Sequence, residues 1–334
     1  GRIRNLPRFR RRGTVSDVVG TLIEGNAPGA VLGSLCSVGD DTDGEPLMGE
    51  VVGFRGKSVL VMPYGELAGV YHGSSLEILG TSFRVPVGND LLGRVVDGLG
   101  QPIDGGPPVD PERDISVWSE GLSPLKRARI EEPLELGVAA LDGLMVCGRG
   151  QRMGIFSGAG VGKSSMLGMI AREVSADINV IALIGERGRE VREFVERDLG
   201  EAGMERSVVV AVTSDQSPVL RVKGAFVATA IAEHFRDQGL HVVFMMDSLT
   251  RFAMAQREIG LAVGEPPTAR GYTPSVFGMM PRLLERCGPL ESGGSITGLY
   301  TVLVEGDDLR DPIADTSRAI LDGHVVLSRR LASR

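Results

Sequence analysis

The pattern of hydrophobic and polar positions divides the chain near residue 126. From residue 13 to about 84, short runs of strand-forming residues such as Ser58–Met62 alternate with turn-forming clusters such as Gly39–Gly44. Short strands at this spacing predict a small β-barrel or sandwich. The segment carries no aromatic cluster, which disfavours a barrel that stacks RNA bases.

After residue 126, continuous apolar runs alternate with segments of helical pattern. Continuously apolar strands between helices predict a parallel sheet covered on both faces, so we expect an α/β domain here. The expected strands are residues 153–156, 179–184, 207–212 and 241–246, and the expected helices begin near 163 and span about 188–198, 218–237 and 248–258.

Two further segments complete the expected organisation. Residues 1–12 contain six arginines and predict a solvated, partly disordered basic arm. Residues 85–125 are rich in Gly, Pro and Asp and predict a connecting segment laid over the surface. We therefore expect an arm (1–12), a barrel domain (13–84), a connection (85–125) and an α/β domain (126–334).

Composition and charge exclude several classes of protein. The net charge of −7 argues against a nucleic-acid binder that works through a basic face. No apolar run approaches the roughly 18 residues of a membrane span, and no signal peptide opens the chain. The three cysteines are far apart and odd in number, which predicts free thiols in a cytosolic protein. The four histidines are scattered, so no metal-ligand role is expected for them.

The strongest chemical signal is a glycine-rich loop between an apolar strand and a helix, the context that phosphate binding requires. Its glycines let backbone N–H groups turn inward, and the helix N-terminus adds positive potential. Lys163 is expected to reach the β- and γ-phosphates, and the Ser164 hydroxyl to coordinate Mg²⁺. The first position of the usual pattern is glycine, and here it is Ser157. The expected nucleotide-binding residues are Ser157, Gly158, Ala159, Gly160, Val161, Gly162, Lys163, Ser164 and Ser165.

Two carboxylates follow apolar strands at their carboxyl ends, where open parallel sheets bind ligands. Asp247 ends the strand 241–246 and is expected to hold Mg²⁺ through water. The alternative is a helix cap, since Asp is a good N-cap residue. Glu186 follows the strand 179–184 and is placed to polarise a water for attack on the γ-phosphorus. Its alternative is an ordinary helix-start glutamate that complements the helix dipole.

Longer motifs carry a resemblance to a known family. The chain resembles the type III protein-export ATPases, the flagellar branch most closely, which are related to F-type ATP synthase β subunits. The resemblance runs from about residue 14 to the end of the chain. Among the motifs that carry it are residues 85–88, 92–95, 101–104, 184–191, 247–251, 253–259, 264–277, 307–312 and 327–330.

The resemblance implies a β-barrel followed by a RecA-like P-loop ATPase domain, assembled into a homo-hexamer in the full-length protein. It implies Mg²⁺-dependent ATP hydrolysis that drives the unfolding or delivery of export substrates. Glu186 matches the family's catalytic glutamate, Arg187 the arginine beside the γ-phosphate, and Arg251 a supporting residue. Residues 264–277 and 306–312 match loops that face the central channel.

The same resemblance implies partners and location: a stator-like regulator, a central stalk protein, export substrates and chaperones, and no nucleic acid. It implies a cytoplasmic protein held peripherally at the inner-membrane export gate. In the family, the adenine pocket, the arginine finger and a helical C-terminal domain lie beyond the position of Arg334. We therefore expect these 334 residues to be a weakly active fragment that binds ATP or ADP through the phosphates.

Four alternatives remain open from the sequence. A virulence-injectisome ATPase and a rotary F- or V-type catalytic subunit share the same motifs. A hexameric nucleic-acid translocase shares the RecA-like ATPase domain, but the excess of acidic residues in this chain argues against that function. A non-enzymatic module that holds nucleotide is disfavoured by Glu186.

Overall fold

The computed structural model describes residues 12–39, 46–80, 82–119, 121–304 and 308–332. The chain forms two compact units, which are described separately. One runs to Phe83 and includes Leu261–Glu265, and the other comprises Arg84–Gly260 and the residues from Pro266 onward. Arg12 begins a strand, and the rest of the expected basic arm lies outside the described residues.

The first unit is a closed six-stranded barrel with the strand order β1-β2-β5-β4-β3-β6. Its core consists of inward-facing apolar side chains, among them Val15, Ile23, Val61 and Leu76. The predicted small barrel is therefore confirmed. Its strands are β1 (Arg12–Val19), β2 (Leu22–Asn26), β3 (Leu35–Val38), β4 (Leu47–Arg55), β5 (Ser58–Pro63) and β6 (Ser75–Gly80).

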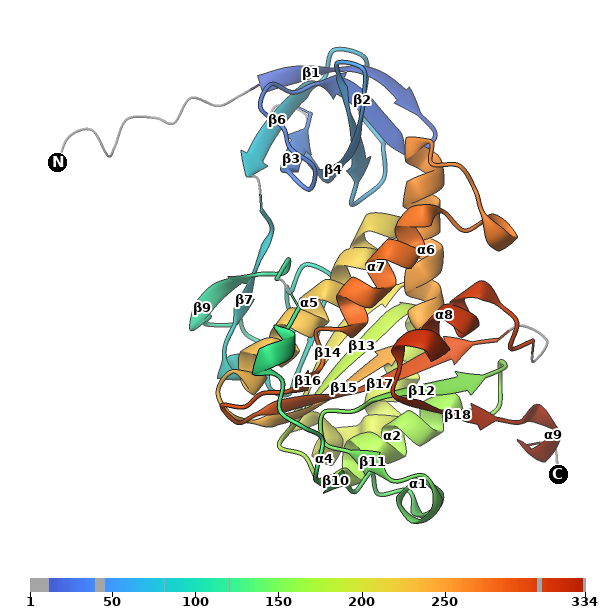
Figure 1. Cartoon of the computed structure of the whole chain (residues 1–334). Coiled ribbons are helices and arrows are strands. Elements are labelled where there is room, and N and C mark those ends of the chain that lie inside the picture. Colours follow the sequence, from blue (N-terminus) through green and yellow to red (C-terminus); the bar gives the residue numbers. More distant parts are fainter. Residues whose placement is uncertain (1–11, 40–45, 81, 120, 305–307, 333–334) are drawn as a thin grey trace. The chain divides into compact units, whose positions relative to one another are not determined.

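The second unit is built on a sheet whose main strands are all parallel, in the order β18-β12-β17-β15-β13-β14-β8 (Figure 1). The short strand β16 (Gly288–Pro289) pairs antiparallel with β17. The parallel strands are β8 (Arg94–Val96), β12 (Arg152–Ser157), β13 (Ile178–Glu186), β14 (Ser207–Thr213), β15 (His241–Asp247), β17 (Ser295–Leu303) and β18 (Gly323–Leu327).

Helices cover both faces of this sheet, as the continuously apolar strands predict. On one face Leu167 and Ile170 of α2 (Lys163–Glu173) pack with the strand residues Ile181, Val209 and Met245. On the other lies α5 (Pro218–Arg236), where a Cβ on Gly224 would come 2.4 Å from Val212. Figure 1 shows α2 and α4 (Gly200–Met204) on one side of the sheet, with α5 and α7 (Pro274–Leu284) on the other.

No helix within the described ranges has the length and apolar character needed to cross a bilayer.

The remaining elements are short or connect the larger ones. These elements are α1 (Ala139–Leu144), α3 (Gly188–Glu193), a π-helix (Phe194–Leu199), α6 (Leu249–Val263), α8 (Pro312–Ile320), α9 (Arg329–Ala332), the 3-10 turns Asn89–Leu91, Pro124–Lys126 and Ala269–Gly271, and the strand pairs β7 (Arg84–Val87) with β9 (Arg113–Ser116) and β10 (Pro133–Leu134) with β11 (Cys147–Gly148).

The segment expected to be a surface connection instead contributes a sheet strand. β8 pairs parallel with β14 at the edge of the large sheet. The Arg94 guanidinium donates to both oxygens of Asp104, at 2.8 and 2.7 Å, and Asp104 accepts from the Val95 amide at 2.9 Å. These contacts fold residues 97–104 back onto the strand. A three-residue strand among glycines and prolines is too short to show the hydrophobic pattern from which strands are predicted.

Candidate functional site

The glycine-rich loop lies between the end of β12 and the start of α2. Gly160 has a φ of 75° and Gly162 a φ of 88°, a left-handed conformation that favours glycine. Ala159 and Gly160 are exposed, so the turn of the loop is open to a ligand. An anion at this position would meet the backbone N–H groups of the loop and the N-terminus of an eleven-residue helix.

Lys163, the first residue of α2, contacts two carboxylates from neighbouring strands. Its Nζ lies 2.5 Å from Oδ1 of Asp247, at the end of β15, and 3.8 Å from Oε1 of Glu186, at the end of β13. All three side chains are largely buried. The structure therefore brings together the lysine and both carboxylates that the sequence singles out.

Thr301 of β17 is a further residue of this cluster. Its Oγ1 lies 2.8 Å from Asp247 Oδ1, and the side chain is fully buried. The strand β17 is absent from the elements predicted from the sequence, because glycine, threonine and tyrosine interrupt its apolar run. No local sequence signal marks Thr301, because its contact with Asp247 depends on the strand order, which places β17 beside β15.

The environment of Glu186 raises its pKa from the ordinary value to about 7. Burial is the main cause, and the negative charge of Asp247 adds to it, while the positive charge of Lys163 opposes both. A hydrogen bond with the carboxyl group of Glu190 also raises the pKa of Glu186 and lowers that of Glu190. A pKa close to the working pH suits a general base.

Arg251 lies close to the same carboxylate. Gly185 makes this possible, since a Cβ at that position would come 2.9 Å from Arg251 Cβ. The charge of Arg251 lowers the pKa of Glu186, against the effect of burial. Within the described residues, Arg251 Nε, Glu186 Oε1 and Ser157 Oγ are buried without a hydrogen-bond partner. Buried polar atoms of this kind need an explanation, and a polar ligand would supply one.

Three of the expected site residues are more exposed than Lys163, Glu186 and Asp247. Arg187 is 77% exposed in its side chain and pairs with Glu190 at 3.7 Å, and Glu190 in turn is hydrogen-bonded to Glu186. Ser164 and Ser165 lie exposed on the first turn of α2.

Two cavities flank the glycine-rich loop. One of about 120 Å³ is lined by Ser157, Gly158, Ser328 and apolar residues, and one of about 320 Å³ by Ala159, Arg251 and Met254 among others.

The cluster fits Mg²⁺ and a nucleotide phosphate. Mg²⁺ prefers oxygen ligands and is usually bound by one or two carboxylates together with substrate phosphates. Asp247 supplies a carboxylate, and Ser164 an exposed hydroxyl next to the lysine that pairs with Asp247. No group of three or more His, Cys, Asp or Glu side chains that could hold a metal by itself occurs among the residues that the structure describes.

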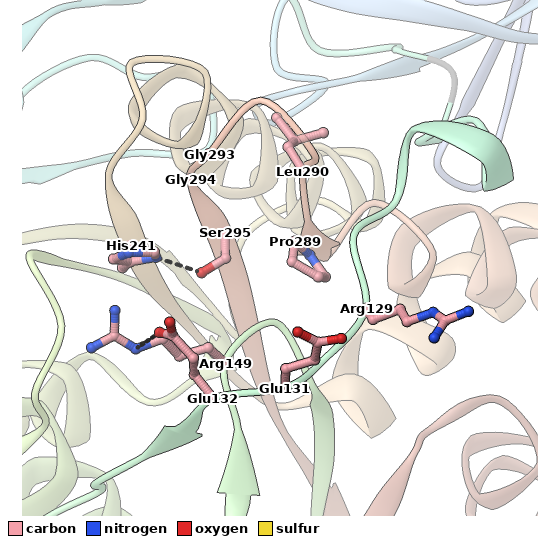
Figure 2. A pocket seen from close by; sticks show the side chains of 10 residues that line it. All are labelled: Arg129, Glu131, Glu132, Arg149, His241, Pro289, Leu290, Gly293, Gly294 and Ser295. Atoms are coloured by element: carbon pink, nitrogen blue, oxygen red, sulfur yellow. Dashed lines mark hydrogen bonds and ion pairs between the residues drawn. The ribbon is translucent and has the colours of Figure 1, made fainter.

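A different pocket, of about 190 Å³, lies at the opposite ends of the same strands (Figure 2). His241 begins β15 and Ser295 begins β17, and their side chains lie 3.0 Å apart, Nδ1 to Oγ. Arg149 Nε lies 3.8 Å from Glu132 Oε2 in the same pocket. This pocket has mixed charge and no glycine-rich loop before a helix, so the candidate nucleotide site is the one at the carboxyl ends of the strands.

Comparison with family models agrees with this architecture. Residues 137–334 match the model described as ATP synthase alpha/beta family, nucleotide-binding domain. Residues 15–80 match the model described as ATP synthase alpha/beta family, beta-barrel domain.

Curated relatives are similar over almost the whole chain. The chain is 54% identical over 327 residues to a "Flagellum-specific ATP synthase" of Bacillus subtilis, which covers 98% of this chain and 74% of the relative. It is also 54% identical over 326 residues to a "Type 3 secretion system ATPase" of Xanthomonas euvesicatoria, covering 97% of this chain and 73% of the relative.

A solved structure is similar in fold as well as in sequence. The assembled ATPase EscN of the enteropathogenic E. coli type III secretion system superposes with a TM-score of 0.90 at 46% identity, over 96% of this chain and 77% of EscN. EscN in complex with its central stalk EscO gives a TM-score of 0.88 at 45% identity, over 96% of this chain and 76% of EscN.

Proposed function

The chain belongs to the ATP synthase alpha/beta family, and from this we propose that it is a Mg²⁺-dependent ATP hydrolase that energises type III protein export in the flagellar system. The observation that carries the proposal is the meeting of Lys163, Glu186 and Asp247 at the glycine-rich loop. The relatives named flagellum-specific ATP synthase, from Bacillus subtilis to Helicobacter pylori, support the flagellar assignment.

In this proposal the loop binds the phosphates. The backbone N–H groups of Gly158–Gly162 and the N-terminus of α2 offer hydrogen bonds and positive potential to the β- and γ-phosphates. Lys163 adds a charge-assisted contact, which is stronger than one between neutral groups. Binding therefore draws Lys163 from Asp247 toward the nucleotide.

Mg²⁺, when bound, neutralises charge on the phosphate oxygens. Asp247, through water, and the Ser164 hydroxyl are the groups we propose to hold it. Glu186 orients the attacking water and accepts its proton, for which a pKa of about 7 is well matched. Arg251, whose charge already acts on Glu186, supports the developing negative charge near the γ-phosphate. Arg187 is proposed to reach the γ-phosphate by a rotation of its exposed side chain.

The working assembly in this proposal is a homo-hexamer with a central stalk. The assembled EscN and its complex with EscO support both parts, because this chain superposes on them over nearly its full length. We extend the proposal to a stator-like regulator, to export substrates and chaperones as partners, and to a cytoplasmic protein bound peripherally at the inner-membrane export gate.

The test is steady-state ATP hydrolysis by this chain, with and without Mg²⁺, compared with its Glu186→Gln variant. We expect Mg²⁺-dependent hydrolysis that the variant loses. Hydrolysis unaffected by the variant would contradict the proposal. Adding single-stranded RNA or DNA distinguishes the nucleic-acid translocase, which would be stimulated.

A second candidate is a virulence-injectisome ATPase. The Xanthomonas relative, named a type 3 secretion system ATPase, is as similar to this chain as the Bacillus one. Replacement of the corresponding segment of the Bacillus subtilis relative by this chain, followed by a swimming assay, tests the flagellar assignment. Loss of swimming with a soluble, ATP-hydrolysing replacement would favour the injectisome.

A further inference from the structure

Thr301 and Asp247 are neighbours on adjacent strands that lie far apart in the sequence. The parallel register of β15 and β17 pairs Met246 with Tyr300, so the next residue of each strand is Asp247 and Thr301. The Thr301 Oγ1 lies 2.8 Å from Asp247 Oδ1 and 3.3 Å from the Met246 carbonyl oxygen. The hydroxyl has a single proton, and the shorter contact to the charged acceptor is the stronger hydrogen bond.

The two oxygens of Asp247 are used unequally. Oδ1 receives both the Thr301 hydroxyl and the Lys163 ammonium group, whereas no hydrogen bond reaches Oδ2 from the part of the chain that the structure describes. The Asp247 side chain is only 4% exposed, so the donors on Oδ1 decide how the carboxylate is oriented. Lys163 is shared with the phosphates in the proposed function, which leaves Thr301 as the permanent donor to Oδ1.

We propose that Thr301 is a positioning residue for Mg²⁺ binding. Its hydroxyl donates a hydrogen bond to Asp247 Oδ1 and so leaves Oδ2 free for the hydrated metal ion. The inference rests on the proposed function, because it assigns a task to a carboxylate that the proposed function places at Mg²⁺. Partners that orient metal-binding carboxylates commonly affect metal affinity when they are removed.

The replacement Thr301→Val keeps the shape of the side chain and removes the donor. Thr301→Ser keeps the donor, and Thr301→Ala is a second hydroxyl-free variant should valine prevent folding. Thr229→Val is a matched control, since Thr229 is also fully buried but donates to the Ala225 carbonyl within α5. Thermal unfolding of each variant establishes that it is folded.

The measurement is calorimetric titration of ADP into this chain, once with MgCl₂ and once with EDTA. The ratio of the two affinities gives the Mg²⁺-dependent part of binding. We expect Thr301→Val to reduce that ratio by about threefold to tenfold, the size of one lost hydrogen bond, and to leave ADP affinity in EDTA unchanged. Thr301→Ser should restore the parent ratio, and Thr229→Val should keep it.

A kinetic readout separates positioning from packing. The Mg²⁺ concentration for half-maximal turnover should rise by the same factor in Thr301→Val, while turnover at saturating Mg²⁺ returns toward the parent value. The inference is overturned if Thr301→Val keeps the parent ratio, if it weakens ADP binding equally in MgCl₂ and EDTA, or if Thr301→Ser behaves like valine. A parent chain without any Mg²⁺-dependent binding would overturn the proposed function itself, and the inference with it.

Discussion

Lys163 Nζ lies 2.5 Å from Asp247 Oδ1, so the lysine of the glycine-rich loop forms an ion pair with the carboxylate that ends β15. Both side chains are largely buried, at 11% and 4% exposure. A phosphate that binds the loop must compete with Asp247 for this lysine. The ion pair therefore links phosphate binding to the charge that Asp247 presents.

We expect Lys163→Ala to weaken binding of MgATP by a few kcal/mol, because a buried charge-assisted contact to the phosphates is lost. The variant also leaves Asp247 without its cation, so its thermal unfolding is measured in parallel. Lys126→Ala is the control, since Lys126 is exposed on a 3-10 turn. Calorimetric titration with MgATP is the measurement. Affinity equal to that of the parent would mean that the loop is not the phosphate site.

Glu186→Gln should spare MgATP binding and lower turnover by roughly 10²–10⁴-fold, the typical contribution of a general base. The amide keeps the size of the side chain but cannot accept a proton from water. Titration with MgATP and steady-state hydrolysis measure the two effects separately. Hydrolysis at the parent rate would assign the base to another residue.

The pKa of Glu186 predicts how kcat/KM depends on pH. Burial and the charge of Asp247 raise this pKa to about 7, so the carboxylate is protonated, and unable to act as a base, at lower pH. The pH dependence of kcat/KM reports the pKa values of essential groups in the free enzyme. kcat/KM should therefore fall by about tenfold for each pH unit well below 7. It should level off above pH 8.

The control for this profile is Glu193→Gln, since Glu193 is exposed and pairs with Arg189 on α3. It should leave the acid limb unchanged. An acid limb centred near the ordinary glutamate pKa of about 4.3 would show that Glu186 is not the group that titrates.

The sequence predicts those parts of the site that depend on neighbouring residues. The glycines of Ser157–Lys163 specify a loop by local backbone conformation, and the structure places that loop between β12 and α2. Asp247 and Glu186 each follow a continuously apolar strand, and parallel strands bring their carboxyl ends to one edge of the sheet. These features need no knowledge of the strand order.

The rest depends on which distant strands become neighbours. Thr301 meets Asp247 only because β17 lies beside β15, and β8 joins the sheet by pairing with β14, which is more than 100 residues away along the chain. Arg187 is a different case, because it pairs with Glu190 only three residues along the chain, and this local spacing does not show whether its side chain is exposed. Polar residues inside strands hide the hydrophobic pattern, and their partners become visible only in the fold.

Arg286 provides a prediction about stability away from the candidate site. Its side chain is 1% exposed and donates to both oxygens of Glu233 on α5, at 2.9 and 2.5 Å. A third contact, 2.7 Å to the Val117 carbonyl oxygen, joins the segment after β9 to the same pair. The pair therefore ties three separate parts of the second unit together.

Arg286→Met should lower the free energy of unfolding of the second unit by about 3 kcal/mol, because it leaves a buried carboxylate without its cation. We expect the lower end of the usual range, since Ser119 still donates to Glu233 at 2.9 Å and Arg236 Nη1 lies 4.0 Å from it. Replacing both partners, Arg286→Met with Glu233→Leu, should recover much of the loss of stability, because no unpaired charge remains buried.

The measurement is urea unfolding, followed by the fluorescence of Trp118. The ring centroids of Trp118 and Phe226 lie 4.6 Å apart. Arg189→Met, in an exposed helical pair, should leave the midpoint unchanged. A midpoint for Arg286→Met as high as that of Arg189→Met would show that the buried pair does not stabilise this unit.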